Sequence, residues 1–451
     1  MTPARDIGRR EFLRQAAAGA AVLSACRSRP GGGVRRPPNV IYAFADEHRW
    51  QSLGFTETPA LQTPHLARLA SEGTTFTHAI SNYPVCSPSR ATMITGRWPR
   101  EHGVIDNGMA LTITEGTLGT TFRDAGYATG YIGKWHLGGV RAEPFGFDLS
   151  LVWTEDNEHW NRSRFHPRDG DPIRSTGYNA TGMTDQALAF IQAHREQPFF
   201  LMLSWNPPHA NMLDAPPAKL ALYPRGSLPP RPNATPFDDR TPNDWLRYQG
   251  YHAHISAIDD EVGRLLAELD AHGIADDTIL IYSSDHGSML GSQGVWGKRQ
   301  PYDESIRVPF LARWPGNVTP SHAVEALFGS IDIMPTLCGL AGVPIPATCR
   351  GQDFSPWLRG ASGPDPEGQL LMHLSKVNAT GGADHPAPLF HGVRTRRHTY
   401  AARSAEPWLL FDDRADPYQM TNLVAVPTER ATVDQMRRLL DGLRRDAGET
   451  G

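Results

Sequence analysis

Apolar segments of strand length alternate with segments of helix length over residues 39–290, and this alternation constrains the fold more than any other feature. The predicted strands cover residues 40–45, 128–132, 199–204 and 278–283. A continuous apolar run is typical of a strand that is buried on both faces. Predicted helices cover residues 63–72, 117–125, 183–194 and 245–272. We therefore predict an α/β fold in which helices sandwich a large, mainly parallel sheet.

The first of these helices shows a start and a stop signal. Thr63 stands at the expected cap position, Pro64 suits the first turn, and Gly73 follows the end. A threonine hydroxyl at this position commonly accepts a hydrogen bond from a free backbone N–H. We therefore expect the Thr63 side chain to cap the helix.

Ionisable residues follow each of the four predicted strands. In an open α/β sheet, ligands bind beyond the carboxyl ends of the strands. Residues that are far apart in sequence are therefore expected to converge there. The residues concerned are Asp46, Glu47, Lys134, His136, His209, Asp285 and His286.

The segment CSPSRATMITGR, residues 86–97, is the sharpest motif in the chain. Pro88 suits the first turn of a helix, which would place Cys86 at a helix N-terminus, where an anion is favoured. Arg90 has a planar guanidinium suited to oxyanions. A thiol nucleophile is one interpretation and a buried structural cysteine another. A thiol phosphatase is disfavoured, because its Cys and Arg are five residues apart and here the separation is shorter.

This segment resembles the C-x-P-S-R-x-x-x-L-T-G signature of type I sulfatases, with Ile94 at the Leu position. Similarity to that family continues along nearly all of the chain after residue 38. On these motifs the chain is identified as a member of the family, which has an alkaline-phosphatase-like fold. The similar segments are Asn39–Asp46, Gly133–Gly138 (GKWHLG), Pro208-His209, Ser284–Gly287, Lys298, Glu304–Pro309 (ESIRVP), Asp332–Leu337 and Asp416–Leu423.

The resemblance implies a modified residue and a metal ion. In the family the cysteine, here Cys86, is oxidised by a formylglycine-generating enzyme to formylglycine, whose aldehyde hydrates to a geminal diol. It also implies one calcium ion held by Asp46, Asp285, His286 and residue 86, and hard oxygen ligands suit calcium. Glu47 is a further candidate ligand, but it stands where the family often has Asp. Its longer side chain leaves direct ligation open.

The resemblance also implies a role for each remaining site residue. A sulfate monoester reacts through a loose transition state, so positioning and oxyanion stabilisation should dominate. One diol oxygen on residue 86 attacks sulfur, while Lys298 and His209 hold the sulfate and protonate the leaving alcohol. Lys134 and Arg90 orient the diol. His136 removes a proton from the second hydroxyl, which expels sulfate and regenerates the aldehyde.

The family resemblance implies hydrolysis of a sulfate ester, of a sulfated carbohydrate or another small organic sulfate. Two alternatives stay open: a phosphonate monoester or phosphodiester hydrolase on the same scaffold, and a non-catalytic, metal-bound carbohydrate-binding protein. Nucleic acid is not an expected partner. The 44 Lys and Arg residues nearly balance 48 Asp and Glu residues, whereas sequence-blind binding of nucleic acid needs a basic face.

The N-terminus predicts export. Arg9-Arg10 precedes an apolar stretch at residues 16–25, which is shorter than the roughly 20 residues that span a bilayer. Residues 1–26 are therefore expected to be a signal peptide for the Tat translocon. The residues before Cys26 resemble a lipobox, so Cys26 is a possible lipid anchor. We expect a periplasmic or cell-envelope protein in which residues 27–37 form a flexible linker.

The remaining sequence predicts a catalytic domain at residues 38–362 and a C-terminal subdomain at residues 363–451. The C-terminal subdomain is expected to be α+β, with a four-stranded antiparallel sheet and one helix. Its expected strands cover residues 370–374, 391–395, 399–403 and 408–411, and its helix covers residues 428–445.

Several loops are candidates for the entrance to the site. They are residues 206–243, 153–168 and 379–388, and long loops of this kind often bind ligands. Trp160, His166, His373 and Arg394 are candidate substrate contacts, and His102 is expected to be structural. Cys338 and Cys349 are either a disulfide in an oxidising compartment or two separate thiols, and both possibilities stay open.

Overall fold

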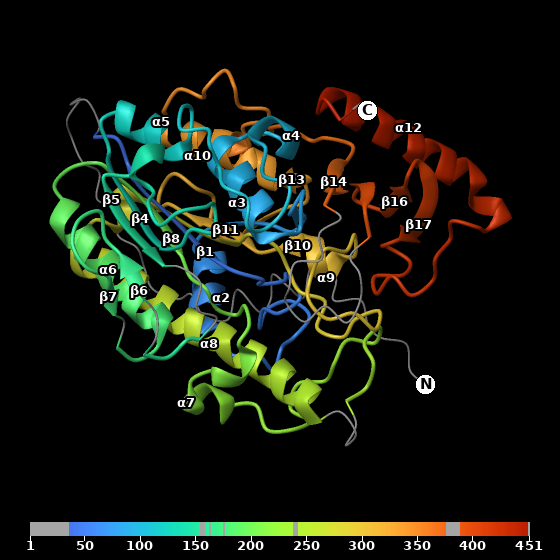
Figure 1. The fold of residues 1–451 in the computed structure, drawn as a ribbon, viewed down its shortest axis with the longest axis horizontal. Coiled ribbons are helices and arrows are strands. Elements are labelled where there is room, and N and C mark those ends of the chain that lie inside the picture. Colours follow the sequence, from blue (N-terminus) through green and yellow to red (C-terminus); the bar gives the residue numbers. More distant parts are fainter. Residues whose placement is uncertain are drawn as a thin grey trace.

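The structure, a computed structural model, describes residues 36–153, 158–161, 164–174, 176–237, 242–375 and 388–449. The predicted signal peptide and most of the linker lie outside these residues. The described chain forms a ten-stranded, a three-stranded and a four-stranded sheet. Figure 1 shows the large sheet, covered by helices, beside the smaller C-terminal unit.

Parallel strands occupy the centre of the large sheet, as predicted. β1 (Asn39–Ala45) lies between β8 (Phe199–Ser204) and β9 (Thr278–Ser284) and runs parallel to both. β4 (Ala128–Lys134) continues the parallel arrangement on the other side of β8. Every residue of β1, β8 and β9 is buried, which explains their continuous apolar sequences.

The edges of this sheet contain shorter strands that the sequence did not predict. The sheet order is β12-β2-β11-β9-β1-β8-β4-β5-β6-β7, and β11, β6 and β7 pair antiparallel with their neighbours. The sheet is therefore mixed at its edges and parallel at its centre. These edge strands are β2 (Thr74–Phe76), β5 (Leu149–Trp153), β6 (Arg164–His166), β7 (Ile173–Arg174), β11 (Phe310–Arg313) and β12 (His322–Val324).

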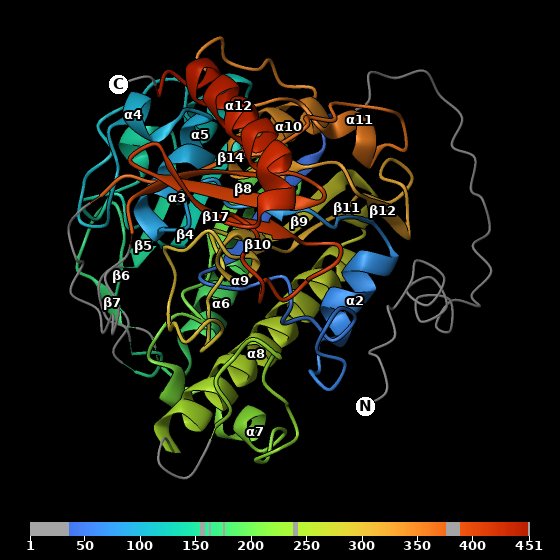
Figure 2. The ribbon, with the colours of Figure 1, turned by 90° about the vertical axis from the view of Figure 1, so that its right-hand side faces the viewer.

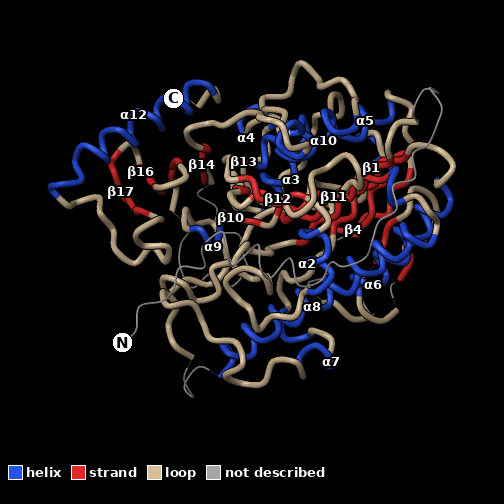
Figure 3. Tube along the Cα trace, turned by 180° about the vertical axis from the view of Figure 1, so that it is seen from behind, coloured by secondary structure: helices blue, strands red, loops and turns tan. Residues whose placement is uncertain are grey.

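Alternate residues of β1 belong to two hydrophobic cores, one on each face of the sheet. Val40 and Tyr42 pack with α3 (Cys86–Thr95), α5 (Leu118–Asp124) and α10 (Ile333–Ala341). Ile41 and Ala43 pack with the helices of the opposite face. Figure 3 shows the strand layer between these two helix layers. The opposite face carries α2 (Pro64–Ser71), α6 (Asn179–His194) and α8 (Pro242–Ala271).

The predicted cap of α2 is wrong. The Thr63 side chain makes no capping hydrogen bond, because its hydroxyl accepts one from the Gly54 N–H at 2.9 Å. Asp259 of α8 caps the helix instead, since its carboxylate accepts hydrogen bonds from the N–H groups of His65 (3.0 Å) and Leu66 (2.7 Å). A tertiary contact therefore replaces the local cap and ties α2 to α8.

The C-terminal unit matches its prediction. Four strands form an antiparallel sheet in chain order, and α12 (Arg430–Asp446) packs on it through Val433, Met436 and Leu440. Figure 2 shows α12 crossing this sheet. The domain boundary at 362/363 stays a prediction. The strands are β14 (Gln369–His373), β15 (Phe390–Arg394), β16 (His398–Arg403) and β17 (Glu406–Asp412).

The remaining elements are short. β3 (Ala79–Ile80), β10 (Arg307–Val308) and β13 (Phe328–Gly329) form the three-stranded sheet. The other short helices are α4 (Pro99–His102), α7 (Pro217–Leu220), α9 (Asp303–Ile306) and α11 (Ser355–Leu358), with 3-10 turns η1 (Glu143–Phe145), η2 (Met212–Asp214), η3 (Ala275–Asp277), η4 (Ser330–Asp332) and η5 (Pro427–Glu429).

Two further sequence questions concern cysteines and membrane spans. Cys338 and Cys349 are free thiols in this structure. Of the two possibilities, a disulfide or two separate thiols, the structure therefore shows the separate thiols. Among the described residues, no helix combines the length and the apolar character that crossing a bilayer requires.

Candidate active site

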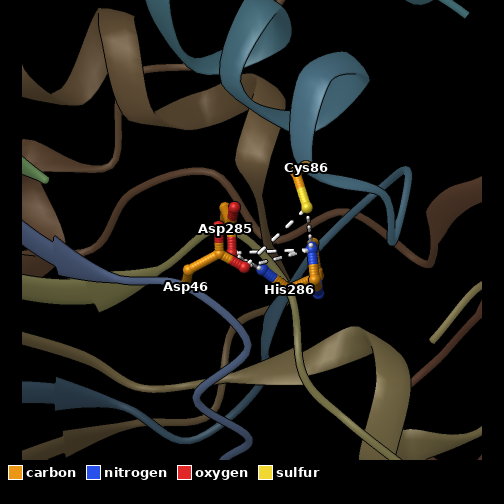
Figure 4. A group of neighbouring side chains, drawn as sticks. All are labelled: Asp46, Cys86, Asp285 and His286. Atoms are coloured by element: carbon orange, nitrogen blue, oxygen red, sulfur yellow. Dashed lines mark hydrogen bonds and ion pairs between the residues drawn. The ribbon is translucent and has the colours of Figure 1, made fainter. Parts of the chain in front are cut away.

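The carboxyl ends of the central strands bring four predicted residues together. Asp46 follows β1, and Asp285 and His286 follow β9, while Cys86 begins α3. One donor atom from each of the four lies within 4.8 Å of the others, and all four residues are buried. Figure 4 shows the contacts of the Cys86 sulfur with Asp46 and His286, and Asp285 lies beside them in contact with His286. The convergence expected from the strand ends is therefore present.

Cys86 occupies the centre of this cluster. Its Sγ lies 3.1 Å from Lys298 Nζ, 3.2 Å from His286 Nε2 and 3.8 Å from Asp46 Oδ1. Burial raises the pKa of the thiol, but the charges of Lys298, Lys134 and His286 outweigh burial and hold that pKa well below its usual value. The site therefore stabilises negative charge at position 86.

Arg90 lies one helical turn after Cys86 and organises both carboxylates. Its Nη2 donates to Asp46 Oδ2 at 2.9 Å and its Nε to Asp285 Oδ2 at 3.0 Å. Its Nη1 donates to the Lys134 carbonyl and to the Ser204 hydroxyl, each at 2.7 Å. The guanidinium is fully buried, so Arg90 acts on residue 86 through the carboxylates that it fixes.

The GKWHLG segment places two more predicted residues at the cluster. Lys134 Nζ lies 2.5 Å from Asp46 Oδ2. Burial lowers the pKa of His136 although a hydrogen bond with Cys86 opposes that effect, so the imidazole is neutral near neutral pH. His136 Nδ1 is buried and has no hydrogen-bond partner among the described residues. A neutral imidazole beside residue 86 is able to accept a proton.

Lys298, Glu47 and His209 form a second group beside the first. Lys298 Nζ contacts Glu47 Oε1 as well as Cys86 Sγ, and His209 Nε2 lies 3.7 Å from Glu47 Oε1. The Glu47 carboxylate is thus directed at Lys298, and its oxygen is grouped with Asp46 and His209 rather than with Cys86 and Asp285. Direct metal ligation by Glu47 stays a prediction.

The first group has the donors and the charge to hold a divalent cation. His286 Nδ1 lies 2.9 Å from the Gly287 carbonyl, so the lone pair of Nε2 faces the cluster, as in many metal-binding histidines. Burial lowers the pKa of His286, but Asp285 and Cys86 raise it to about 9. The negative charges of Asp285 and Cys86 thus favour a proton on His286, and a divalent cation would supply that positive charge instead. The donor set therefore fits a metal ion.

Several residues around the cluster were not predicted from the sequence. Ser204, the last residue of β8, accepts the hydrogen bond from Arg90. Asn107 Oδ1 accepts a hydrogen bond from the N–H of Ser87 at 3.0 Å. Arg299 donates to Asp106 at 2.7 Å. Two positions in the sequence could have indicated these residues: Ser204 ends a predicted strand, and Arg299 directly follows Lys298.

The candidate substrate contacts divide into packed and partly exposed residues. Arg394 is 2% exposed and makes two hydrogen bonds to the Asp303 carboxylate, at 2.9 and 3.1 Å, so it is a structural residue. His373 is buried with its Nε2 3.0 Å from Arg299 Nη1. Trp160 and His166 are half-buried. These two stay candidates for substrate contact.

The predicted entrance loops are only partly described. Residues 379–387 lie outside the described residues, as do 154–157, 162–163 and 238–241. The described part of 206–243 contains the short helices η2 and α7 and the first residues of α8, which begins at Pro242. His102 is buried with its Nε2 3.1 Å from the Thr92 hydroxyl, which agrees with a structural role.

Comparisons with known proteins agree with this geometry. A family model described as Sulfatase matches residues 38–343, and one described as N-sulphoglucosamine sulphohydrolase, C-terminal, matches residues 291–446. The chain is 35% identical to an ulvan-active sulfatase of Formosa agariphila over 86% of this chain and 78% of that protein. It is 26% identical to an N-acetylglucosamine-6-O-sulfatase of Bacteroides thetaiotaomicron over 93% and 88% of the two chains.

A solved structure has the same fold as this chain. The structure of yidJ from Bacteroides fragilis is 26% identical and has a TM-score of 0.82, with coverage of 93% of this chain and 98% of that one. The chain therefore belongs to the sulfatase family of the alkaline-phosphatase-like superfamily, and it is a sulfatase, an enzyme that hydrolyses sulfate esters.

Proposed function

We propose that this sulfatase removes sulfate from a sulfated carbohydrate, using formylglycine made from Cys86 and one calcium ion. The observation that carries the proposal is the position of Cys86 Sγ, which touches Lys298 and His286 beside two buried carboxylates. A relative named for N-acetylglucosamine 6-O-sulfate supports the substrate class.

Residue 86 supplies the attacking group in this proposal. Its Sγ stands where a hydroxyl of the hydrated aldehyde would lie. The hydrated aldehyde supplies one hydroxyl to attack sulfur and a second whose deprotonation lets sulfate leave, and a thiol lacks that second hydroxyl. Cys86 is fully buried, so the formylglycine-generating enzyme must act before the chain folds.

The cations around residue 86 would hold the sulfate group. Calcium, bound by Asp46, Asp285 and His286, would withdraw charge from the sulfate oxygens. Burial lowers the pKa of Lys298, but Cys86, Glu47 and Asp46 raise it above its usual range. Lys298 therefore stays protonated and binds the sulfate. His209, 17% exposed at its side chain, is the better placed donor for the leaving alcohol.

The proposed role of His136 predicts the pH dependence of the reaction. His136 must be neutral to accept a proton, and burial lowers its pKa below 6.5. Activity is therefore retained as the pH falls through 6.5 and is lost only when the pH falls through the lowered value. His136→Gln should reduce kcat by roughly 10²- to 10⁴-fold. The pH profile of kcat/KM checks this, and an acid limb centred above pH 6.5 would contradict it.

A substrate panel tests the proposed function. Sulfated saccharides, a steroid sulfate, choline sulfate and an aryl phosphonate should be compared with calcium present and after chelation. We expect the sulfated saccharides to have the highest kcat/KM, and we expect chelation to remove activity that added calcium restores. Faster turnover of the phosphonate would instead favour the phosphonate monoester hydrolase alternative.

We also propose export through the Tat translocon to the cell envelope. The Arg9-Arg10 pair and the sequence before Cys26 support it. A translocon that carries folded proteins agrees with a modification that must precede folding. Fractionation of cells that express Cys26→Ala checks the lipid anchor, since the variant should move from the membrane fraction to the soluble one.

A further inference from the structure

A second group of possible metal ligands, two buried histidines and one partly exposed aspartate, lies apart from the Cys86 cluster. It consists of His159, which follows β5, Asp214 at the end of η2, and His254 in α8. The two histidines are fully buried. Asp214 Oδ1 lies 3.6 Å from His254 Nε2 and 3.9 Å from His159 Nε2. α8 runs along the face of the large sheet opposite α3 (Figure 2).

Two backbone carbonyls are also directed at this group. The His209 carbonyl oxygen lies 3.0 Å from His159 Nε2, and the Asn211 carbonyl oxygen lies 3.2 Å from His254 Nε2. Three oxygens therefore face two imidazole nitrogens. If both Nε2 atoms carry a proton, they donate hydrogen bonds to the two carbonyl oxygens. Asp214 Oδ1 is then left buried without a hydrogen bond among the described residues, which is unfavourable.

A second buried oxygen near this group also lacks a partner. Asn179 Nδ2 lies 3.0 Å from His159 Nδ1, while Asn179 Oδ1 has no hydrogen bond among the described residues. Rotating the amide by half a turn would let Oδ1 accept a proton from Nδ1, and such orientations follow from the hydrogen-bond network. Tyr178 Oη, 2.7 Å from His254 Nδ1, can accept in the same way.

In that tautomer the Nε2 lone pair of His159 faces the His209 carbonyl oxygen, and that of His254 faces the Asn211 carbonyl oxygen. Asp214 Oδ1 lies near both nitrogens. The two nitrogens and Asp214 Oδ1 lie within 4.8 Å of one another. No proton then lies between these nitrogens and the oxygens that they face, an arrangement that a cation stabilises. Metal-binding histidines usually donate a hydrogen bond through the other ring nitrogen. The separations of 3.0, 3.2, 3.6 and 3.9 Å are close to the roughly 3.0–3.6 Å between ligands bonded at about 2.1 Å.

We propose that His159, His254 and Asp214 bind one divalent transition-metal ion, with zinc as the best match. Two imidazoles with one carboxylate are a donor set that zinc accepts. The ion would bind Asp214 Oδ1 directly. It would also orient His159 so that its Nδ1–H donates a hydrogen bond to Asn179 Oδ1. It would also fix residues 209–214, the segment that begins at His209. The proposal does not depend on formylglycine, calcium or the substrate.

A zinc titration of the metal-stripped protein tests the proposal. Excess calcium is added first to fill the Cys86 cluster, and zinc binding is then measured by calorimetry. We expect one equivalent of zinc to bind the wild type and Asp285→Asn. Asp214→Asn and His254→Gln should each weaken binding at least ~10-fold. Cobalt should give visible absorption bands that the same two variants lose.

His272→Gln is the matched control, because His272 is a partly exposed histidine just after the end of α8 and away from His254, 2.8 Å from Glu268. Its zinc affinity should equal that of the wild type. Asp214→Asn preserves side-chain size, and its melting temperature without zinc shows whether it folds. The proposal fails if the wild type binds no zinc under these conditions. It also fails if binding is lost in Asp285→Asn and kept in Asp214→Asn.

Discussion

Replacing Cys86 by alanine is expected to abolish turnover of sulfate esters, with a loss of roughly 10⁴- to 10⁶-fold in kcat, as for other lost nucleophiles. The variant retains the carboxylates, Lys298 and His286, but no group at position 86 is then able to attack sulfur or carry a second hydroxyl. The measurement is kcat on the best substrate, with circular dichroism to establish folding.

Cys338→Ala provides the matched control for that variant. Cys338 is as buried as Cys86, but it lies in α10 and packs in the hydrophobic core. Its replacement should alter stability and leave kcat near the wild-type value. Retention of more than a small percentage of wild-type activity by folded Cys86→Ala would show that residue 86 is not the nucleophile.

The second large effect concerns stability. Arg90→Gln removes a buried charge that holds Asp46 and Asp285, whose side chains are 0% exposed. Burial and Cys86 oppose the ionisation of Asp46, yet Lys134, His209 and Arg90 hold its pKa below the usual range. Loss of one partner of a buried pair typically destabilises by about 3–5 kcal/mol. We expect a loss of that size in calcium-free buffer, measured by urea unfolding.

An exposed ion pair gives the control for Arg90→Gln. Arg350 is 50% exposed at its side chain and pairs with Glu101 at 2.7 Å. Pairs of this kind contribute about 0–1 kcal/mol, so Arg350→Gln should hardly change the urea midpoint. Added calcium should reduce the effect of Arg90→Gln, because the ion also neutralises the two carboxylates. Equal midpoints for the two variants would contradict the account of Arg90.

The central strands and their terminal residues were predictable because each has a strong local signal. β1, β8 and β9 are continuous apolar runs, and parallel strands place their carboxyl ends at one edge. The positions of Asp46 and Asp285 therefore followed from the sequence. The Cys86 helix was predictable from Pro88 and the motif around it.

Other features were not predictable, because distant partners determine them. Strands of two or three residues, such as β3 and β13, have no periodic signal and exist through pairing alone. The cap of α2 comes from Asp259, almost two hundred residues later in the chain. The direction of the Glu47 carboxylate depends on Lys298, which no local pattern around Glu47 reveals. His159 and His254 likewise meet only in the folded protein.

Mass spectrometry of the peptide that contains residue 86 tests the central claim most directly. The protein should be produced with the formylglycine-generating enzyme, and the modified fraction should be compared with kcat in the same preparation. The account predicts an aldehyde at position 86, trapped by a hydrazide reagent, in proportion to activity. An unmodified thiol in a fully active preparation would contradict it.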